Sequence, residues 1–205
     1  MSLEVRSIRP GQDVTPFLEA GRRVFEGDPA WVAPLAFELK QRLHPAKNPF
    51  FEHGEAALFV ATRDGRPVGR ISASIDRLWQ RTWRDHTGHI GFFDTIDDPE
   101  VAARLVTAAE GWLREHGADR ALGPMSLGAN EEIGLLVDGF EHPPSLMMAH
   151  SRRWQGRLLE ASGYAKENDL LSWRFDGSTP LTRRAVAAWE SIQALPELTL
   201  RSIDV

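Results

Sequence analysis

The chain has 205 residues, of which 42% are apolar and 26% charged, and its formal net charge is -5 at pH 7. This composition is typical of a soluble globular protein of one or two domains. Acidic and basic residues are interspersed, so no basic stripe indicates nucleic acid or an anionic membrane as a partner. The lack of cysteine excludes disulfides, thiolate metal ligands and cysteine nucleophiles, and it agrees with a reducing compartment.

The N-terminal segment MSLEVRSIRPGQ has no apolar core of signal-peptide length. No apolar run approaches the roughly 18 residues that would span a membrane. We therefore expect a cytoplasmic protein that contacts neither a membrane nor nucleic acid.

The first segments predict a strand and two helices. Residues 3–8 alternate between apolar and polar and are rich in branched side chains, which predicts a strand that ends before Pro10. Apolar residues near helical spacing predict a helix over 13–27, with Asp13 as its candidate cap, and a second helix over 34–43.

An antiparallel set of strands follows. Residues 56–78 contain two apolar runs joined by RDGRP, where Asp64-Gly65 is a strong signal for a β-hairpin turn. Residues 86–96 predict a third strand of this set, which the chain reaches through a loop over 79–85.

The clearest helix lies over 99–116, with Gly117 well placed as its C′ residue. Its apolar stripe consists of Val101, Leu105, Ala108, Ala109, Trp112 and Leu113. Residues 120–125 then predict a short buried strand. The loop over 126–145 is longer than a connection requires, and loops of that length are usually functional or disordered. Another helix is expected over 147–162, and a last strand over 169–175.

The composition changes after this strand. We expect one domain over 1–176, a linker helix within 177–197, and a strand over 198–205. Ser178 or Thr179 would cap the helix, with Pro180 near its first position. LTLRSI at 198–203 repeats LEVRSI at 3–8 in Leu, Arg, Ser and Ile. Either two amphipathic strands match by accident, or residues 198–205 begin a second copy of the domain.

This order of elements resembles the plan of the GNAT acetyltransferase superfamily. ALFVATRDGRPVGRISA resembles that superfamily's second and third strands, and residues 88–117 resemble its fourth strand and cofactor helix. More narrowly, NPFFEHGEAALFVA, GHIGFFDTIDDPEVAARL and LVDGFEHPPSLMM resemble uncharacterised tandem GNAT-like proteins of about double length. The resemblance covers roughly residues 3–175. It implies a GNAT-like mixed α/β fold, in which helices flank a mostly antiparallel sheet.

The resemblance also implies transfer of an acyl group from acetyl-CoA or another acyl-CoA to a small-molecule amine. In the superfamily, the fourth strand offers its backbone to the pantetheine arm, and free N–H groups at the start of the next helix hold the pyrophosphate. Carried over by register, the implied cofactor contacts are Phe92, Phe93, Asp94, Glu100, Val101 and Ala102.

The phosphate loop departs from the superfamily pattern. The Arg/Gln-x-x-Gly-x-Gly/Ala run falls on DDPEVA at 97–102, where only Ala102 fits. Glycines let a backbone curl around phosphate oxygens, and neither central position has one. Asp98 is well placed to cap the helix and Pro99 to open it. Each acid would also repel a pyrophosphate by about 1 kcal/mol in partly exposed surroundings. A well-capped structural helix is therefore the alternative interpretation.

Two further positions depart from the resemblance. Many members have a Tyr that protonates the leaving thiolate, and an Asn that begins the same helix. These positions fall on Leu159 and Arg152, so both usual assignments are lost.

Three polar residues in the long loop are the candidate substrate and catalytic groups. Glu131 or Glu132 could act as a general base, because an attacking amine must lose a proton, and Asn130 could contact the substrate. The alternative is that adjacent glutamates in a glycine-rich loop are simply solvated. DGFEHPPSLMM, later in the loop, could shape a pocket wall or form a rigid surface loop.

The remaining motifs give weaker evidence for a function. His86 and His89 would lie on opposite faces of a strand, which argues against a metal site. Trp79 and Trp83 lie among arginines. They could form a surface that binds an anion or stacks on a ring, or they could belong to a loop whose tryptophans cover the core. The sequence has no P-loop, hydrolase-elbow or zincin motif.

Two functions remain open. The first is an N-acyltransferase that uses an acyl-CoA and no metal. The second is a GNAT-like domain that has lost its cofactor and serves as a structural or ligand-binding half, beside a second GNAT-like domain or in a homo-oligomer.

Overall fold

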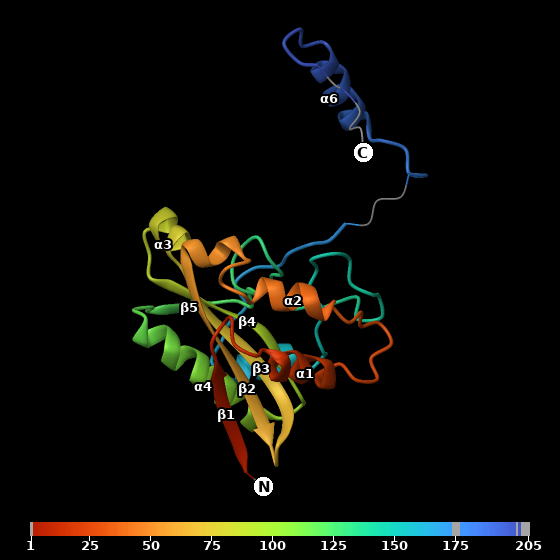
Figure 1. Cartoon of the computed structure of the whole chain (residues 1–205). Coiled ribbons are helices and arrows are strands. Elements are labelled where there is room, and N and C mark those ends of the chain that lie inside the picture. Colours follow the sequence, from red (N-terminus) through yellow and green to blue (C-terminus); the bar gives the residue numbers. More distant parts are fainter. Residues whose placement is uncertain (1, 174–176, 200, 202–205) are drawn as a thin grey trace. The chain divides into compact units, whose positions relative to one another are not determined.

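The structure is a computed structural model that describes residues 2–173, 177–199 and 201 (Figure 1). Contacts divide the chain into two units, Met1–Glu167 and Asn168–Val205. The first unit holds the sheet and the helices up to α5, and the second holds α6.

The sheet of the first unit has five strands. In spatial order they are β1 (Leu3–Ile8), β2 (Gly54–Arg63), β3 (Arg66–Asp76), β4 (Thr87–Thr95) and β5 (Arg120–Leu122). Strands β1 to β4 pair with their neighbours in antiparallel fashion, whereas β4 and β5 are parallel. The expected mixed, mostly antiparallel sheet is thereby confirmed.

The hairpin between β2 and β3 turns at Asp64 and Gly65. Their φ angles are 50° and 77°, and Arg63 pairs with Arg66 across the turn. Two central residues with positive φ are typical of a type I′ turn, which matches the twist of the flanking strands. This confirms the turn expected from the sequence.

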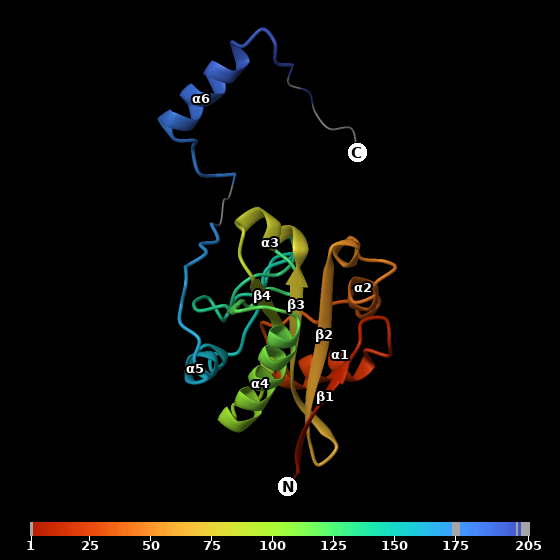
Figure 2. The same ribbon diagram turned by 90° about the vertical axis from the view of Figure 1, so that its left-hand side faces the viewer.

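Helices cover both faces of the sheet, as Figure 2 shows. One face carries α1 (Thr15–Val24), α2 (Ala36–Arg42) and the 3-10 helix η1 (Pro49–Glu52), and the other carries α4 (Pro99–Glu115) and α5 (Gln155–Ala161). Alternating side chains of β2 supply the two cores. Leu58 and Val60 pack with α1, whereas Ala57 and Phe59 pack with α4.

Helix α4 begins and ends as expected. Asp98 is its N-cap, Pro99 occupies the first turn, and Gly117 follows the helix with a φ of 84°. The buried residues of α4 are Val101, Ala102, Leu105, Val106, Ala109 and Leu113.

The helix expected over 147–162 is much shorter, because α5 begins at Gln155. Ser151 accepts a hydrogen bond from the Leu136 N–H at 3.0 Å, and His150 and Arg152 both bind Asp28. Successive side chains on a helix point about 100° apart, so a regular helix would separate these contacts. They hold the segment before α5 in an irregular path.

The segment expected to be a loop over 79–85 is mostly helical. Helix α3 (Arg77–Trp83) starts at Asp76, whose carboxylate accepts from the N–H groups of Leu78 and Trp79 at 2.8 and 3.1 Å. This N-cap satisfies two of the free donors that a helix start leaves.

The second unit differs from expectation in its strand and its cap. Residues 169–173 are irregular, and in the described part of the chain no strand pairs with them. Helix α6 (Arg183–Gln193) is capped by Thr182, whose hydroxyl accepts from the Ala185 N–H at 3.2 Å. The strand expected over 198–205 falls largely on residues outside those described.

Candidate functional site

Strand β4 carries a bulge at its centre. Arg70 and Ser72 of β3 pair with Asp94 and Gly91 of β4, so β4 has one residue more between these pairs. Phe92, within this stretch, has a φ of 46°, which is rare for a bulky side chain. A bulge interrupts the ladder and leaves backbone groups free for other partners.

Strands β4 and β5 part after three residue pairs. Their ladder ends at His89 and Leu122. The chain then passes directly over β4, where the Met125 N–H donates to the Ile90 carbonyl at 2.6 Å. A Cβ at Gly91 would lie 2.0 Å from the Met125 carbonyl oxygen, so only glycine fits there. The segment after β5 therefore packs on β4 where the strands diverge.

Backbone groups along the second half of β4 are bound by side chains of this chain. The Phe92 N–H donates to the Ser126 hydroxyl at 3.3 Å. The Gln155 side chain donates to the Phe93 carbonyl at 2.6 Å, and the Trp154 indole donates to the Thr95 carbonyl at 2.7 Å. An extended ligand beside this strand would have to displace these contacts.

The N–H groups at the start of α4 also have internal acceptors. The Asp98 carboxylate accepts from the N–H groups of Glu100 and Val101 at 2.8 and 3.4 Å. The Ala102 N–H donates to the Asp98 backbone carbonyl at 3.1 Å. All three predicted phosphate-binding N–H groups are thus occupied.

Arginines neutralise the acids at this helix start. Arg63 binds Asp98 at 2.7 Å and Glu100 at 3.5 Å, and Arg157 binds Asp97. Burial raises the pKa of the Asp98 carboxyl, but hydrogen bonds from Arg63 and the helix N–H groups lower that pKa more. The pKa of Asp98 therefore lies below its ordinary value.

The two predicted catalytic glutamates lie together under one arginine. Arg42 of α2 forms ion pairs with Glu131 and, at 3.1 Å, with Glu132. Asn48 donates to Glu131 at 3.3 Å. Burial raises the pKa of Glu131, although Arg42 and Asn48 oppose that rise. Asn130, the predicted substrate contact, is exposed beside this pair.

A second arginine lies on the same side of β4. Arg70 donates to Asp94 from Nε and Nη2, each at 2.7 Å. The Arg42 and Arg70 guanidinium carbons lie 5.1 and 5.4 Å from the centre of the Phe92 ring. The structure therefore brings Phe92, Asp94 and both glutamates into one neighbourhood, in which each carboxylate has an arginine partner.

No protein-family model matches the chain. A bacterial ceramide synthase from Caulobacter vibrioides is 40% identical over 205 residues, covering 99% of this chain and 53% of that protein. Protein YghO from Escherichia coli is 42% identical over 200 residues, covering 98% of this chain and 51% of that protein. The chain thus spans about half the length of the curated relatives it matches.

Among solved structures, the chain is similar to an aminoglycoside acetyltransferase from an uncultured soil metagenomic sample. The TM-score is 0.51 at 13% identity, and the match covers 85% of this chain and 95% of that one. The chain has the GNAT acetyltransferase fold. The β4 bulge and the parting of β4 from β5 thus belong to a GNAT sheet.

The two positions that depart from the GNAT pattern have structural contacts. Leu159 is buried in the core under α4. Arg152 donates to the carbonyls of Val24 and Glu26, each at 2.8 Å, and binds Asp28 at 3.2 Å. Both side chains hold elements of the GNAT domain together.

The sequence did not point to several residues whose side chains contact β4 or its side chains. They are Arg42, Arg70, Ser126, Trp154 and Gln155. Arg70 had a visible signal, because it interrupts an apolar strand run. The other four lie in helices or loops, and nothing in their spacing indicates that they meet β4.

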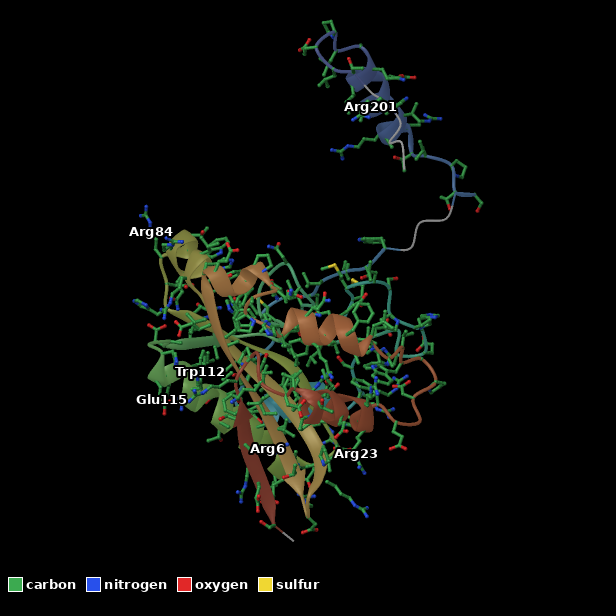
Figure 3. All side chains as sticks on the ribbon, viewed as in Figure 1. Arg6, Arg23, Arg84, Trp112, Glu115 and Arg201 are labelled. Atoms are coloured by element: carbon green, nitrogen blue, oxygen red, sulfur yellow. The ribbon has the colours of Figure 1, made fainter. Side chains whose placement is uncertain are left out.

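A cleft of about 790 Å3 lies apart from these residues, at the end of the sheet where β4 begins. Its lining includes His53, whose Nδ1 lies 3.0 Å from Asp76, and Arg77, which binds Glu55 at 2.8 Å. Figure 3 shows Arg84, another lining residue, at the outer tip of α3. None of the predicted site residues lines this cleft.

The remaining motif residues are divided between core and surface. The Trp79 ring contacts the buried His89, with ring centres 5.0 Å apart, whereas Trp83 is exposed. Burial lowers the pKa of His89. No cluster of three metal-ligating side chains occurs among the described residues. In the same part of the chain, no helix is long and apolar enough to cross a membrane.

Proposed function

We propose that this chain is a GNAT-fold half of an enzyme that N-acylates a long-chain amine, and that its own coenzyme A site is closed. The similarity to a ceramide synthase over 99% of the chain supports the reaction. A ceramide is the amide of a fatty acid and a long-chain amino alcohol. Its synthesis is an acyl transfer to an amine, the kind of reaction that the GNAT resemblance implies.

The proposal that the coenzyme A site is closed rests on one observation. Four of the six predicted cofactor residues have a backbone group that is bound by a side chain of the chain itself: Phe92, Phe93, Glu100 and Val101. A pyrophosphate at α4 would have to displace the Asp98 carboxylate from the N–H groups of Glu100 and Val101. Loss of an N-cap costs about 1 kcal/mol.

A second candidate is catalysis by this chain itself. Glu131 or Glu132 would deprotonate the amine, and Asn130 would contact it at the exposed edge of the loop. The observation that favours this function is the burial of Glu131, which raises its pKa towards the range of a useful base. The pairing of both glutamates with Arg42 weakens this candidate, because a nearby cation stabilises the charged carboxylate and so lowers its affinity for the proton of the amine.

Amide formation from a long-chain amine and a long-chain acyl-CoA tests these alternatives. We expect the 205-residue chain to be inactive alone and a form extended to the length of its relatives to be active. In that longer form, Glu131→Gln should leave the rate within about twofold if this half does not catalyse. Activity of the 205-residue chain, lost in Glu131→Gln, would instead establish the second candidate. No amide formation by either form would overturn the proposed reaction.

A further inference from the structure

Helix α3 turns three arginines towards the cleft at the start of β4. Arg77 and Arg81 of the helix and Arg84, which follows it, have the spacing i, i+4 and i+7 of one helix face, and all three line the cleft. The sequence left two interpretations for this segment, a surface for an anion or ring and a loop whose tryptophans cover the core. Trp79 packs against the buried His89, so this tryptophan belongs to the core while the arginines line the cleft.

Two of these arginines have no partner in the part of the chain that the structure describes. Arg77 binds Glu55 at 2.8 Å and lies 3.4 Å from Gln80. Arg81 and Arg84, by contrast, form neither an ion pair nor a side-chain hydrogen bond with any described residue. Guanidinium groups that share a concave surface and have no counter-charge raise the local concentration of anions. The C-terminal part of this helix face is therefore free to bind an anionic ligand.

His53 adds an imidazole from the segment between η1 and β2. Its Nδ1 lies 3.0 Å from the Asp76 carboxylate, which also accepts from the N–H groups of Leu78 and Trp79 at 2.8 and 3.1 Å. Because Asp76 acts as the acceptor in all three contacts, Nδ1 carries a proton and Nε2 is the ring atom left for a ligand. The Phe50 ring packs edge-on against the imidazole, with ring centres 5.6 Å apart. His53 is thus held in one orientation, and protonation of Nε2 turns this atom into a donor for an anion.

Three acids also line the cleft, and two of them are bound by the chain itself. Arg77 holds Glu55, and Asp85 accepts from the N–H and hydroxyl groups of Thr87 at 3.1 and 2.8 Å. Glu52 is the third acid, and it is exposed without a partner among the described residues. The two unpaired arginines therefore exceed the one unpaired carboxylate, and a proton on the imidazole increases this excess of positive charge.

We infer that this cleft binds the phosphate group of a small organic molecule through Arg81, Arg84 and His53. One guanidinium fork satisfies a carboxylate, whereas a phosphate monoester has three oxygens and a charge of about −1.5 to −2 at pH 7, which matches two arginines and an imidazole. The cleft volume of about 790 Å3 lies within the range of about 300–1,000 Å3 that small-molecule sites occupy, so the rest of such a molecule also fits. None of the residues assigned to acyl transfer lines the cleft, so the inference does not depend on the proposed function.

Titration of methyl phosphate into the isotopically labelled 205-residue chain, followed by NMR at constant ionic strength, tests the inference. We expect saturable shifts of the backbone N–H signals of residues 77–86. Arg81→Gln/Arg84→Gln should raise the dissociation constant at least about tenfold, because it removes both unpaired cations. The matched control is Arg6→Gln/Arg23→Gln, which removes the same charge from exposed positions that Figure 3 shows away from α3. This control should leave the dissociation constant within about twofold.

Two single variants separate the roles of the other lining residues. Glu52→Gln removes the unpaired carboxylate and should lower the dissociation constant about two- to fivefold. His53→Asn removes the imidazole donor and should raise the dissociation constant at least about threefold. In wild type, the ring signals of His53 should shift with the same dissociation constant as the backbone signals.

The absence of saturable shifts with methyl phosphate would overturn the inference, as would an equal loss of binding in Arg6→Gln/Arg23→Gln. Acetate that binds as tightly as methyl phosphate would overturn the assignment to a phosphate group. Circular dichroism of each variant confirms that it is folded. The tighter binding expected for Glu52→Gln cannot arise from partial unfolding, so the test does not depend on losses alone.

Discussion

The side chain of Gln155 donates a hydrogen bond of 2.6 Å to the backbone carbonyl of Phe93, across the bulge of β4. Gln155 is fully buried, and its amide also lies 3.3 Å from the Asp94 carboxylate. A side chain from the start of α5 thus binds the strand that a GNAT cofactor would line. This contact is the main support for the proposal that the coenzyme A site of this chain is closed.

Gln155→Ala should destabilise the fold. The change leaves the Phe93 carbonyl without its buried donor and opens a small cavity, so we expect a loss of about 2–4 kcal/mol of unfolding free energy. Urea unfolding followed by circular dichroism measures it. Glu160→Ala, at an exposed position of the same helix, should change stability by less than about 0.5 kcal/mol. If Gln155→Ala lowered the unfolding free energy as little as Glu160→Ala does, the contact of Gln155 with β4 would not stabilise the fold.

Gly91→Ala should be among the most damaging single substitutions. Its Cβ would meet the Met125 carbonyl oxygen at 2.0 Å, and backbone atoms cannot move aside cheaply. We expect a loss of more than about 3 kcal/mol, or failure to fold. Gly111→Ala in α4 is the matched control, because nothing lies within 4 Å of its added Cβ. Higher helix propensity should stabilise that variant by about 0.5–1 kcal/mol. A tolerated Gly91→Ala would disprove the close packing of the segment after β5.

Because Asp98 caps α4, the free energy of unfolding should depend on pH in the acidic range. The folded-state pKa of Asp98 is lowered, so its contribution is present above the unfolded pKa of about 3.9 and is lost as pH falls through the folded value. Asp98→Asn keeps a capping oxygen but loses the ion pair with Arg63. Wild type should therefore lose more stability than Asp98→Asn between about pH 5 and pH 3. Parallel stability curves would contradict this assignment.

Arg42→Met should change the titration of the glutamate pair. Arg42 opposes the effect of burial on Glu131, and its removal leaves Glu131 and Glu132 adjacent without their cation. We expect the pKa of Glu131 to rise further, as measured by NMR of labelled side-chain carboxyl groups. Lys40→Met, which removes an exposed cation from the same helix, serves as the control. An unchanged Glu131 titration in Arg42→Met would exclude Arg42 as its partner.

The sequence predicted much of the sheet because its signals are local. The turn at Asp64-Gly65 needs only two residues that tolerate positive φ, and α4 carries its cap, its stripe and its final glycine within one segment. Such features do not depend on what the rest of the chain does. Both segments are also among those that resemble the GNAT superfamily, and this resemblance implied the fold.

The internal contacts at β4 and at the start of α4 were only partly predictable. The sequence suggested that Asp98 caps α4, because a cap lies next to the N–H groups that it binds. The contacts of Gln155 and Ser126 with β4 join residues 62 and 34 positions apart, and no local pattern encodes such pairings. The shortened α5 escaped prediction for the same reason, since distant Asp28 anchors His150 and Arg152.

The most direct test of the closed site is a calorimetric titration of long-chain acyl-CoA into the 205-residue chain, with hydrogen exchange of residues 92–94 and 100–102 recorded in parallel. We expect no saturable heat and unchanged exchange at these positions, because the N–H groups of Phe92, Glu100, Val101 and Ala102 already have internal acceptors. Saturable binding that slows exchange at both stretches would contradict it and return this chain to the active acyltransferases.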